Sequence, residues 1–313
     1  MVKALFIQKN LDHQLIDINN HQLDFMHLSK VYWPGENITK GDMLEYYYQI
    51  ADFILPYLKG RPQSLNRFPD GIQGMSFYQK DVAGKAPDWI SNFAYTTHEG
   101  LIRSYILGDG IETLLYMASL GCIEINPWFS SATSPDFPDY CVIDLDPDAN
   151  NSFAQVIHVA LIAKEILDEL SIQGYCKTSG STGIHIYIPL GAKYTYEQSK
   201  AFIKMVLDQV HVRLPEFTSM ERNLKKREGK LYLDYLQNHA SATVASPYSL
   251  RPKPGAPVST PLDWKELRPG LSMYDFNIKT IFERLNRVGD LFSGVLGPGI
   301  DLEKAMVLGN RIF

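Results

Sequence analysis

The stretch YCVIDLDPD, residues 140–148, ends an apolar strand with two closely spaced carboxylates. Alternate residues of a strand point to the same face, so Asp144 and Asp146 project together while Ile143 and Leu145 face the other way. Two charges at the end of a buried strand are costly unless they are paired or bind a cation. Oxygen ligands of this kind suit Mg²⁺ or Mn²⁺, so the pattern predicts a divalent-metal site. A capping role at the following helix explains the pair equally well on this pattern alone.

Two further stretches add polar groups that suit a phosphorylated substrate. Glycines and hydroxyl residues at 178–183 can offer backbone N–H groups to an anion, and the strand that follows places His185 opposite its core-facing isoleucines. Asp234, within GKLYLDYLQN at 229–238, is a third strand carboxylate between apolar neighbours. Three strand aspartates and a phosphate loop together predict a two-metal site for phosphoryl chemistry. Arg251 can grip phosphate oxygens in bidentate fashion, although a surface arginine in a proline-rich loop is the commoner case.

Composition limits the class of protein. The 313 residues, 45% of them hydrophobic, suffice for one large domain or two smaller ones. A net charge of −5 is not that of a general nucleic-acid binder, so contacts to DNA would need a local basic patch. The segment RNLKKREGK at 222–230 is one candidate, and a solvated polar segment is the equal alternative. The three cysteines follow no zinc-ligand spacing, and no signal peptide or membrane span is recognisable, so we expect a cytoplasmic chain.

Helical and strand patterns alternate along the chain, which predicts a mixed α+β fold. Capping boxes begin helices at Thr39 and Thr195, and Ser152 caps a third helix that runs to about Leu170. Further helices are expected at 111–120, 278–288 and 302–308, strands at 142–146, 184–190 and 231–236, and loops at 177–183 and 247–261.

Six short stretches, in this order, resemble the polymerase domain of bacterial ATP-dependent DNA ligase D, a member of the archaeo-eukaryotic primase superfamily that acts in non-homologous end joining. They are HLSKVYWP (27–34), APDW (86–89), CVIDLDPD (141–148), SGSTGIHIYIPL (179–190), LDYLQN (233–238) and SPYSLR (246–251). The resemblance covers nearly the whole chain, and the set is far more specific than a pair of aspartates alone. It implies a single primase-polymerase domain over 1–313. An N-terminal α/β portion, at about 1–110, would pack against a catalytic core at 111–313 with an RRM-like sheet and flanking helices.

The resemblance also implies roles for individual residues. Asp144, Asp146 and Asp234 match the catalytic aspartates that bind two Mn²⁺ or Mg²⁺ ions. Ser179, His185 and Arg251 match residues that hold the triphosphate of the incoming nucleotide, and Phe77 and Tyr78 match an aromatic pair beside the incoming base and the template. Lys30, Lys40 and His27 match the pocket that grips a 5′-phosphate at a break.

Two positions depart from the pattern of the family. Many relatives carry a basic residue where Thr182 stands, so one phosphate contact is lost or supplied elsewhere. Relatives often have Asn where His27 stands, and a histidine there can still donate a hydrogen bond.

The function that the resemblance implies is addition of nucleotides, preferably ribonucleotides, to a primer 3′-hydroxyl at gaps or double-strand breaks in DNA. Implied partners are Ku and a DNA ligase, and the implied location is the nucleoid of a bacterial or archaeal cytoplasm. Two alternatives remain: a metal-dependent phosphatase with Asp144 as nucleophile, and a DNA-end binding module without catalytic activity.

Overall fold

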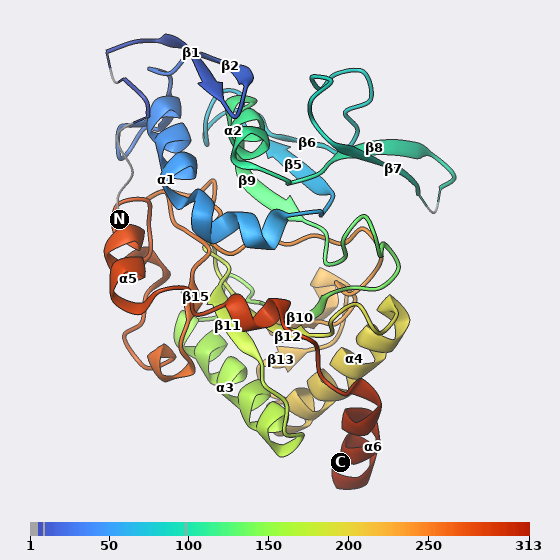
Figure 1. Ribbon diagram of the computed structural model, residues 1–313. Coiled ribbons are helices and arrows are strands. Elements are labelled where there is room, and N and C mark those ends of the chain that lie inside the picture. The colour runs from blue at the N-terminus through green and yellow to red at the C-terminus, as the bar shows by residue number, and fades with distance from the viewer. Residues whose placement is uncertain (1–5, 9, 98) are drawn as a thin grey trace. The chain divides into compact units, whose positions relative to one another are not determined.

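The computed structural model describes residues 6–8, 10–97 and 99–313 (Figure 1). The chain divides into two compact units, each built from segments that are distant in sequence. The first unit comprises Met1–Thr133, Thr243–Ser259 and Phe276–Gly289, and the second comprises Ser134–Ala242, Thr260–Asp275 and Asp290–Phe313. We had predicted a division near residue 110, whereas here the chain leaves the first unit after residue 133 and returns to it twice.

The second unit is built on a six-stranded sheet in the order β13-β14-β10-β12-β11-β15. Its neighbours are antiparallel except for β13 and β14, which are parallel. The strands are β10 (Tyr140–Asp146), β11 (Tyr175–Thr178), β12 (Ile184–Pro189), β13 (Thr218–Ser219), β14 (Leu231–Asp234) and β15 (Pro261–Leu262), and the helices of this unit are α3 (Phe153–Glu169), α4 (Tyr196–Arg213) and α6 (Leu302–Ile312).

The two long helices α3 and α4 run along the sheet of the second unit (Figure 1). Both begin with a capping box: the box at Thr195 was predicted from sequence, and at Ser152, where a cap was predicted, Gln155 completes the box. Leu167 of α3 and Ile186 of β12 both lie against Gly174, so α3 packs on the isoleucine face of the sheet. The aspartates of β10 alternate with these core residues and therefore belong to the opposite face.

Among its described residues, the first unit contains a three-stranded antiparallel sheet in the order β6-β5-β9, three hairpin-like pairs and three helices. Tyr47 of α1 donates a hydrogen bond to the Ile123 carbonyl of β9, which ties the helix to the sheet. The strands are β1 (His13–Ile18), β2 (His21–Met26), β3 (Val31–Trp33), β4 (Ile38–Thr39), β5 (Gln63–Arg67), β6 (Phe77–Gln79), β7 (Asn92–Thr96), β8 (Ile102–Ile106) and β9 (Cys122–Pro127), and the helices are α1 (Lys40–Leu58), α2 (Ile111–Ser119) and α5 (Ile281–Val288). Short 3₁₀ helices complete the two units: η1 (Leu224–Lys226), η2 (Trp264–Glu266), η3 (Met273–Asp275) and η4 (Ser293–Leu296).

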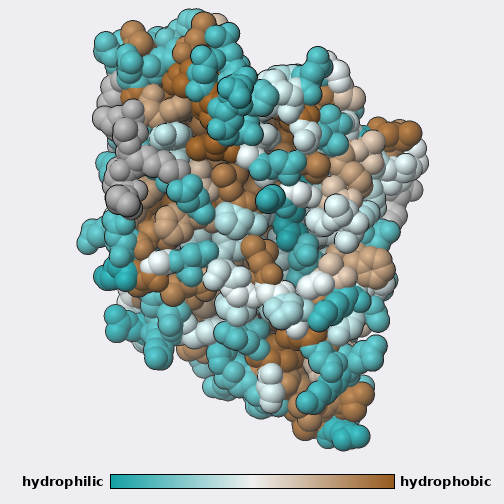
Figure 2. Space-filling model, in the orientation of Figure 1, coloured by the Kyte–Doolittle hydropathy of each residue, from teal (hydrophilic) through white to brown (hydrophobic). Residues whose placement is uncertain are grey.

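The predicted mixed α+β architecture is confirmed, with helix boundaries that differ by a few residues. The predicted loop at 177–183 is wrong at its start, because Lys177 and Thr178 are the last residues of β11. The predicted strand at 231–236 ends at Asp234. On the face drawn in Figure 2, hydrophobic residues lie in separate patches among hydrophilic ones. None of the helices among the described residues combines the length and apolar character that crossing a membrane requires.

Candidate active site

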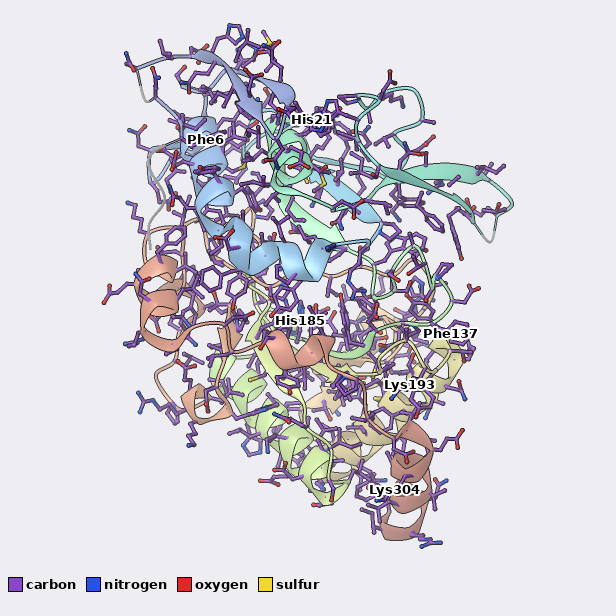
Figure 3. The ribbon with its side chains drawn as sticks, in the orientation of Figure 1. Phe6, His21, Phe137, His185, Lys193 and Lys304 are labelled. Carbon is purple, nitrogen blue, oxygen red and sulfur yellow. The ribbon has the colours of Figure 1, made fainter. Side chains whose placement is uncertain are left out.

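A row of polar residues crosses the sheet of the second unit. Asp144 on β10 lies directly opposite Asp234 on β14 and directly opposite His185 on β12. His185 in turn lies directly opposite Lys177 on β11. Residues directly opposite one another share a face of the sheet, so Asp234, Asp144, His185 and Lys177, here called the polar row, point to the same side. Figure 3 labels His185 within this sheet.

Asp146 lies on the same face as Asp144, one pleat further along β10, where it is opposite Tyr232. Its side chain is 56% exposed. Partial burial raises the pKa of Asp146, and the nearby carboxylates of Asp234 and Asp148 raise it further, while Arg227 lowers it. The negative charges on this face therefore repel one another, and a cation between them would relieve that repulsion.

Each carboxylate turns toward a partner of its own. The Nε2 atom of His185 lies 3.4 Å from Oδ1 of Asp144. Asp146 Oδ2 lies 3.8 Å from Nη1 of Arg227, and Asp234 Oδ1 accepts hydrogen bonds from the Tyr232 hydroxyl and the Gln237 amide. As they stand, no three His, Cys, Asp or Glu side chains of the described residues are grouped closely enough to hold a metal ion. Metal binding at the three aspartates would require changes of side-chain rotamer.

Ser179 organises the loop between β11 and β12. Its hydroxyl oxygen accepts hydrogen bonds from the backbone amides of Ser181, Thr182 and Gly183, at 3.1, 3.2 and 3.0 Å. These amides, which we had expected to face an anion, instead polarise the Ser179 hydroxyl and favour its action as a donor. A Cβ atom at Gly183 would stand 2.2 Å from the Leu145 carbonyl oxygen, so the loop requires glycine at this position.

Arg251 and the aromatic pair belong to the first unit. Nε of Arg251 lies 2.8 Å from Oε2 of Glu124 in an ion pair whose side chains are 16% and 7% exposed. Tyr78, Asn66 and Glu124 lie opposite one another across β6, β5 and β9. Partial burial and the charge of Glu124 raise the pKa of Tyr78, although its side chain remains largely exposed. Arg251 is therefore held by a carboxylate on the same sheet that carries Tyr78.

A basic groove of about 550 Å³ lies beside the same aromatic residues. Phe77 lies opposite Arg67, whose guanidinium is 5.3 Å from the centre of the ring. Phe77 and Tyr78 are consecutive residues of β6, so their side chains leave opposite faces of the strand. The groove is lined by four cations, Arg67, Lys80, Lys85 and Arg103, with Phe77, Tyr78, Gln79 and Asp81.

Lys30, Lys40 and His27 also lie in the first unit. Lys40 is the first residue of α1, and its ammonium donates to the Met26 carbonyl at 2.9 Å. Burial, together with the charges of Lys30 and Arg67, lowers the pKa of Lys40 to about 8. Lys30 forms a 2.5 Å ion pair with Asp70, and both side chains are well exposed. Lys30 is thus near enough for its charge to act on the buried Lys40, while Lys30 itself is accessible.

Comparison with known proteins shows the family of the chain. The family model described as LigD, primase-polymerase domain matches residues 39–292. The chain belongs to the LigD primase-polymerase domain family. It is 34% identical over 269 residues to the bifunctional non-homologous end joining protein LigD of Bacillus subtilis, a match that covers 86% of this chain and 43% of that protein. It is 29% identical to the multifunctional non-homologous end joining protein LigD of Mycolicibacterium smegmatis, covering 84% of this chain and 35% of that protein.

A solved structure shares the fold of this LigD-family domain. The polymerase domain from Mycobacterium tuberculosis ligase D, in complex with DNA, aligns with a TM-score of 0.80 and 27% sequence identity. The alignment covers 88% of this chain and 98% of that one. The family and the primase-polymerase enzyme class predicted from sequence are confirmed. The LigD-family domain spans less than half the length of the curated relatives that it matches.

The structure brings together the predicted residues of the second unit, namely Asp144, Asp146, Asp234 and His185, on one face, with Ser179 in the adjoining loop. Their roles, and those of Arg251, Phe77, Tyr78, Lys30, Lys40 and His27, stay predictions.

Three residues that contact the predicted site residues of the LigD-family domain were not recognised from its sequence. Lys177 falls in the predicted loop at 177–183. Alternation of the apolar Cys176 with the polar Lys177 is the local signal that would have placed it in β11. Arg227 lies in the basic segment at 222–230, but its approach to Asp146 depends on a fold that no local pattern encodes. The ion pair of Glu124 with Arg251 joins residues 127 positions apart.

Proposed function

We propose that this LigD-family domain adds nucleotides to the 3′-hydroxyl of a primer strand at gaps and broken ends of DNA. The observation that carries the proposal is the antiparallel register that sets Asp144 opposite Asp234, with Asp146 on the same face. The phosphatase alternative loses its support, because the chain belongs to the LigD primase-polymerase domain family. The binding module without catalytic activity remains as an outcome of the experiment below.

The carboxylates of Asp144, Asp146 and Asp234 would hold the divalent ions. The fit rests on oxygen ligands from facing strands and on an Asp146 carboxylate whose pKa is raised by partial burial and, to a smaller extent, by Asp234 and Asp148. Bound Mn²⁺ or Mg²⁺ ions would lower the pKa of the primer hydroxyl and neutralise charge on the triphosphate. The partners that the carboxylates now have, such as Arg227, would be exchanged for the ions.

The polar row supplies donors for a triphosphate. His185 would donate from Nε2 to a phosphate oxygen, and Ser179 would donate from a hydroxyl that three amides polarise. In the first unit, Arg251 would offer its guanidinium while Glu124 fixes its orientation. In the second unit, His185 and Ser179 would thereby stabilise the negative charge that increases as pyrophosphate leaves.

The first unit would bind DNA. Single-stranded nucleic acid is commonly held by basic grooves with aromatic side chains on which bases stack, and the groove at Phe77 and Tyr78 has both features. Lys30, Lys40 and His27 would bind the 5′-phosphate on the far side of a gap. The relatives from Bacillus subtilis and Mycolicibacterium smegmatis are non-homologous end joining proteins, so we extend the proposal to broken ends, with Ku and a ligase as partners.

Primer extension on a one-nucleotide gap tests the proposal. Wild-type protein with Mn²⁺ and ribonucleoside triphosphates should extend the primer, and deoxyribonucleotides should be used less well. Asp144→Asn and Asp234→Asn should each reduce extension by at least 100-fold, on the order of the loss of one catalytic electrostatic group. Asp168→Asn, which removes an exposed carboxylate of α3 paired with Lys164, is the matched control and should extend normally.

Two results would count against the proposal. Equal extension by wild type and Asp144→Asn would remove the catalytic assignment. DNA binding without extension by wild type, under any of the divalent ions, would favour the module without catalytic activity.

A further inference from the structure

Lys177 is a fully buried lysine at the end of the polar row. It is the third residue of β11, it has 0% exposure, and it lies directly opposite His185. Its ammonium nitrogen lies 2.9 Å from Nδ1 of His185. None of the steps proposed above uses this lysine.

A buried ammonium is costly unless it has hydrogen-bond acceptors and compensating charge. The Lys177 ammonium has an acceptor in the imidazole of His185, and it also lies 5.6 Å from the centre of the Tyr187 ring, within the range of a cation–π contact. The carboxylate of Asp144 lies on the other side of the same imidazole. The row thus places a lysine, a histidine and an aspartate in sequence across three strands.

This order determines which nitrogen of His185 carries the proton. An ammonium group has donors and no acceptor, so a hydrogen bond from Lys177 requires an unprotonated Nδ1. The ring proton of the neutral imidazole is then on Nε2, and Nε2 is the atom that lies 3.4 Å from Asp144 Oδ1. His185 therefore presents an N–H donor on the side of the catalytic aspartates.

We propose that Lys177 is a positioning residue for His185: it holds the imidazole in the Nε2–H form and orients that N–H toward the position where the triphosphate binds. The inference rests on the proposed function for the triphosphate, but the relation between Lys177 and His185 can be tested without it. A protonated Lys177, on the strand next to the imidazole, would also add to the field that attracts the polyphosphate.

The first test is the protonation pattern of the imidazole. Long-range ¹H–¹⁵N correlation spectra of protein with labelled histidine distinguish Nδ1–H from Nε2–H rings, and His185→Asn identifies the signal among the eight histidines. Wild-type His185 should have Nε2 protonated and Nδ1 unprotonated. Lys177→Met should shift the ring toward the other tautomer, whereas Lys164→Met, at a partly buried lysine of α3, should leave it unchanged.

A wild-type ring with a proton on Nδ1 would overturn the inference, and this result does not depend on whether a variant folds. An unchanged spectrum in folded Lys177→Met would overturn it as well.

The second test is a double-mutant cycle on primer extension. Lys177→Met should raise KM for the nucleotide about tenfold, the usual size of one hydrogen bond to a charged group, with a smaller change in kcat. If Lys177 acts through His185, adding Lys177→Met to His185→Asn should change KM little further. If the factor by which Lys177→Met raises KM is the same with and without His185→Asn, Lys177 does not act through His185 and the positioning role is contradicted. If wild type extends no primer, the proposed function fails, while the spectra still decide the relation between the two residues.

Discussion

Binding of a 5′-phosphate at Lys40 should weaken as the pH rises above 8. Burial and two neighbouring cations lower the pKa of Lys40 to about 8, from its ordinary value of 10.5. A bound phosphate dianion would favour the charged ammonium and bring its pKa back toward the ordinary value. Linkage then predicts an affinity about tenfold lower at pH 9 than at pH 7, because the protein must take up a proton to bind.

Fluorescence anisotropy with a labelled gapped duplex measures this effect. The phosphate stays almost wholly dianionic over this pH range, since its second pKa is about 6. Lys40→Arg should remove the pH dependence because arginine remains charged, and a duplex with a 5′-hydroxyl should bind more weakly without the tenfold change. A wild-type affinity for the phosphorylated duplex that is constant from pH 7 to pH 9 would refute the role of Lys40.

The same pKa shift acts on folding with the opposite sign. The unfolded chain, in which Lys40 has its ordinary pKa of 10.5, retains this proton to a higher pH than the folded chain. Below about pH 8 the folded chain therefore bears the full free-energy cost of burying a charged Lys40. Between pH 8 and 10.5 that cost decreases, because Lys40 loses its proton in the folded chain. The contribution of Lys40 to the free energy of unfolding should rise over the interval in which phosphate binding declines.

Two further predictions concern single side chains. Asp70→Asn removes the carboxylate that pairs with Lys30. Because an exposed ion pair is easily exchanged, this variant should bind a 5′-phosphorylated gap roughly two- to fivefold more tightly at low salt. Unchanged anisotropy curves would contradict this. Gly183→Ala should lower the free energy of unfolding in urea by about 2 kcal/mol or more, because its Cβ would stand 2.2 Å from a backbone oxygen. Gly35→Ala, where a Cβ meets nothing within 4 Å, is the control for Gly183→Ala, and equal losses in the two variants would contradict the explanation.

Much of the candidate site could be predicted from local sequence because a strand alternates faces with a period of two. That rule alone placed Asp144 with Asp146 and separated His185 from its isoleucine neighbours. It could not place Asp234 opposite Asp144, because the register between β10 and β14 depends on pairing of residues 90 positions apart. The residue pattern and the family resemblance grouped Asp234 with the other two aspartates, but only the structure gives this register.

Other features depend on non-local structure and left little local signal. Lys177 lies next to a Ser- and Gly-rich stretch. That composition predicts a loop at a position where the structure has the end of β11. The division into two units does not follow the order of the sequence, because segments at 243–259 and 276–289 return to the first unit. Lys40 has no local signal in the sequence, because its lowered pKa depends on burial in the folded chain.

The most direct test of the central claim is the position of manganese. Crystals grown with Mn²⁺ and a non-hydrolysable ribonucleoside triphosphate, measured near the manganese absorption edge, locate the ions by anomalous scattering. The account predicts two peaks about 3.5–4 Å apart, held by Asp144, Asp146 and Asp234, with the triphosphate bound to both. Nucleotide bound without manganese at these three carboxylates, or manganese at other residues, would contradict it.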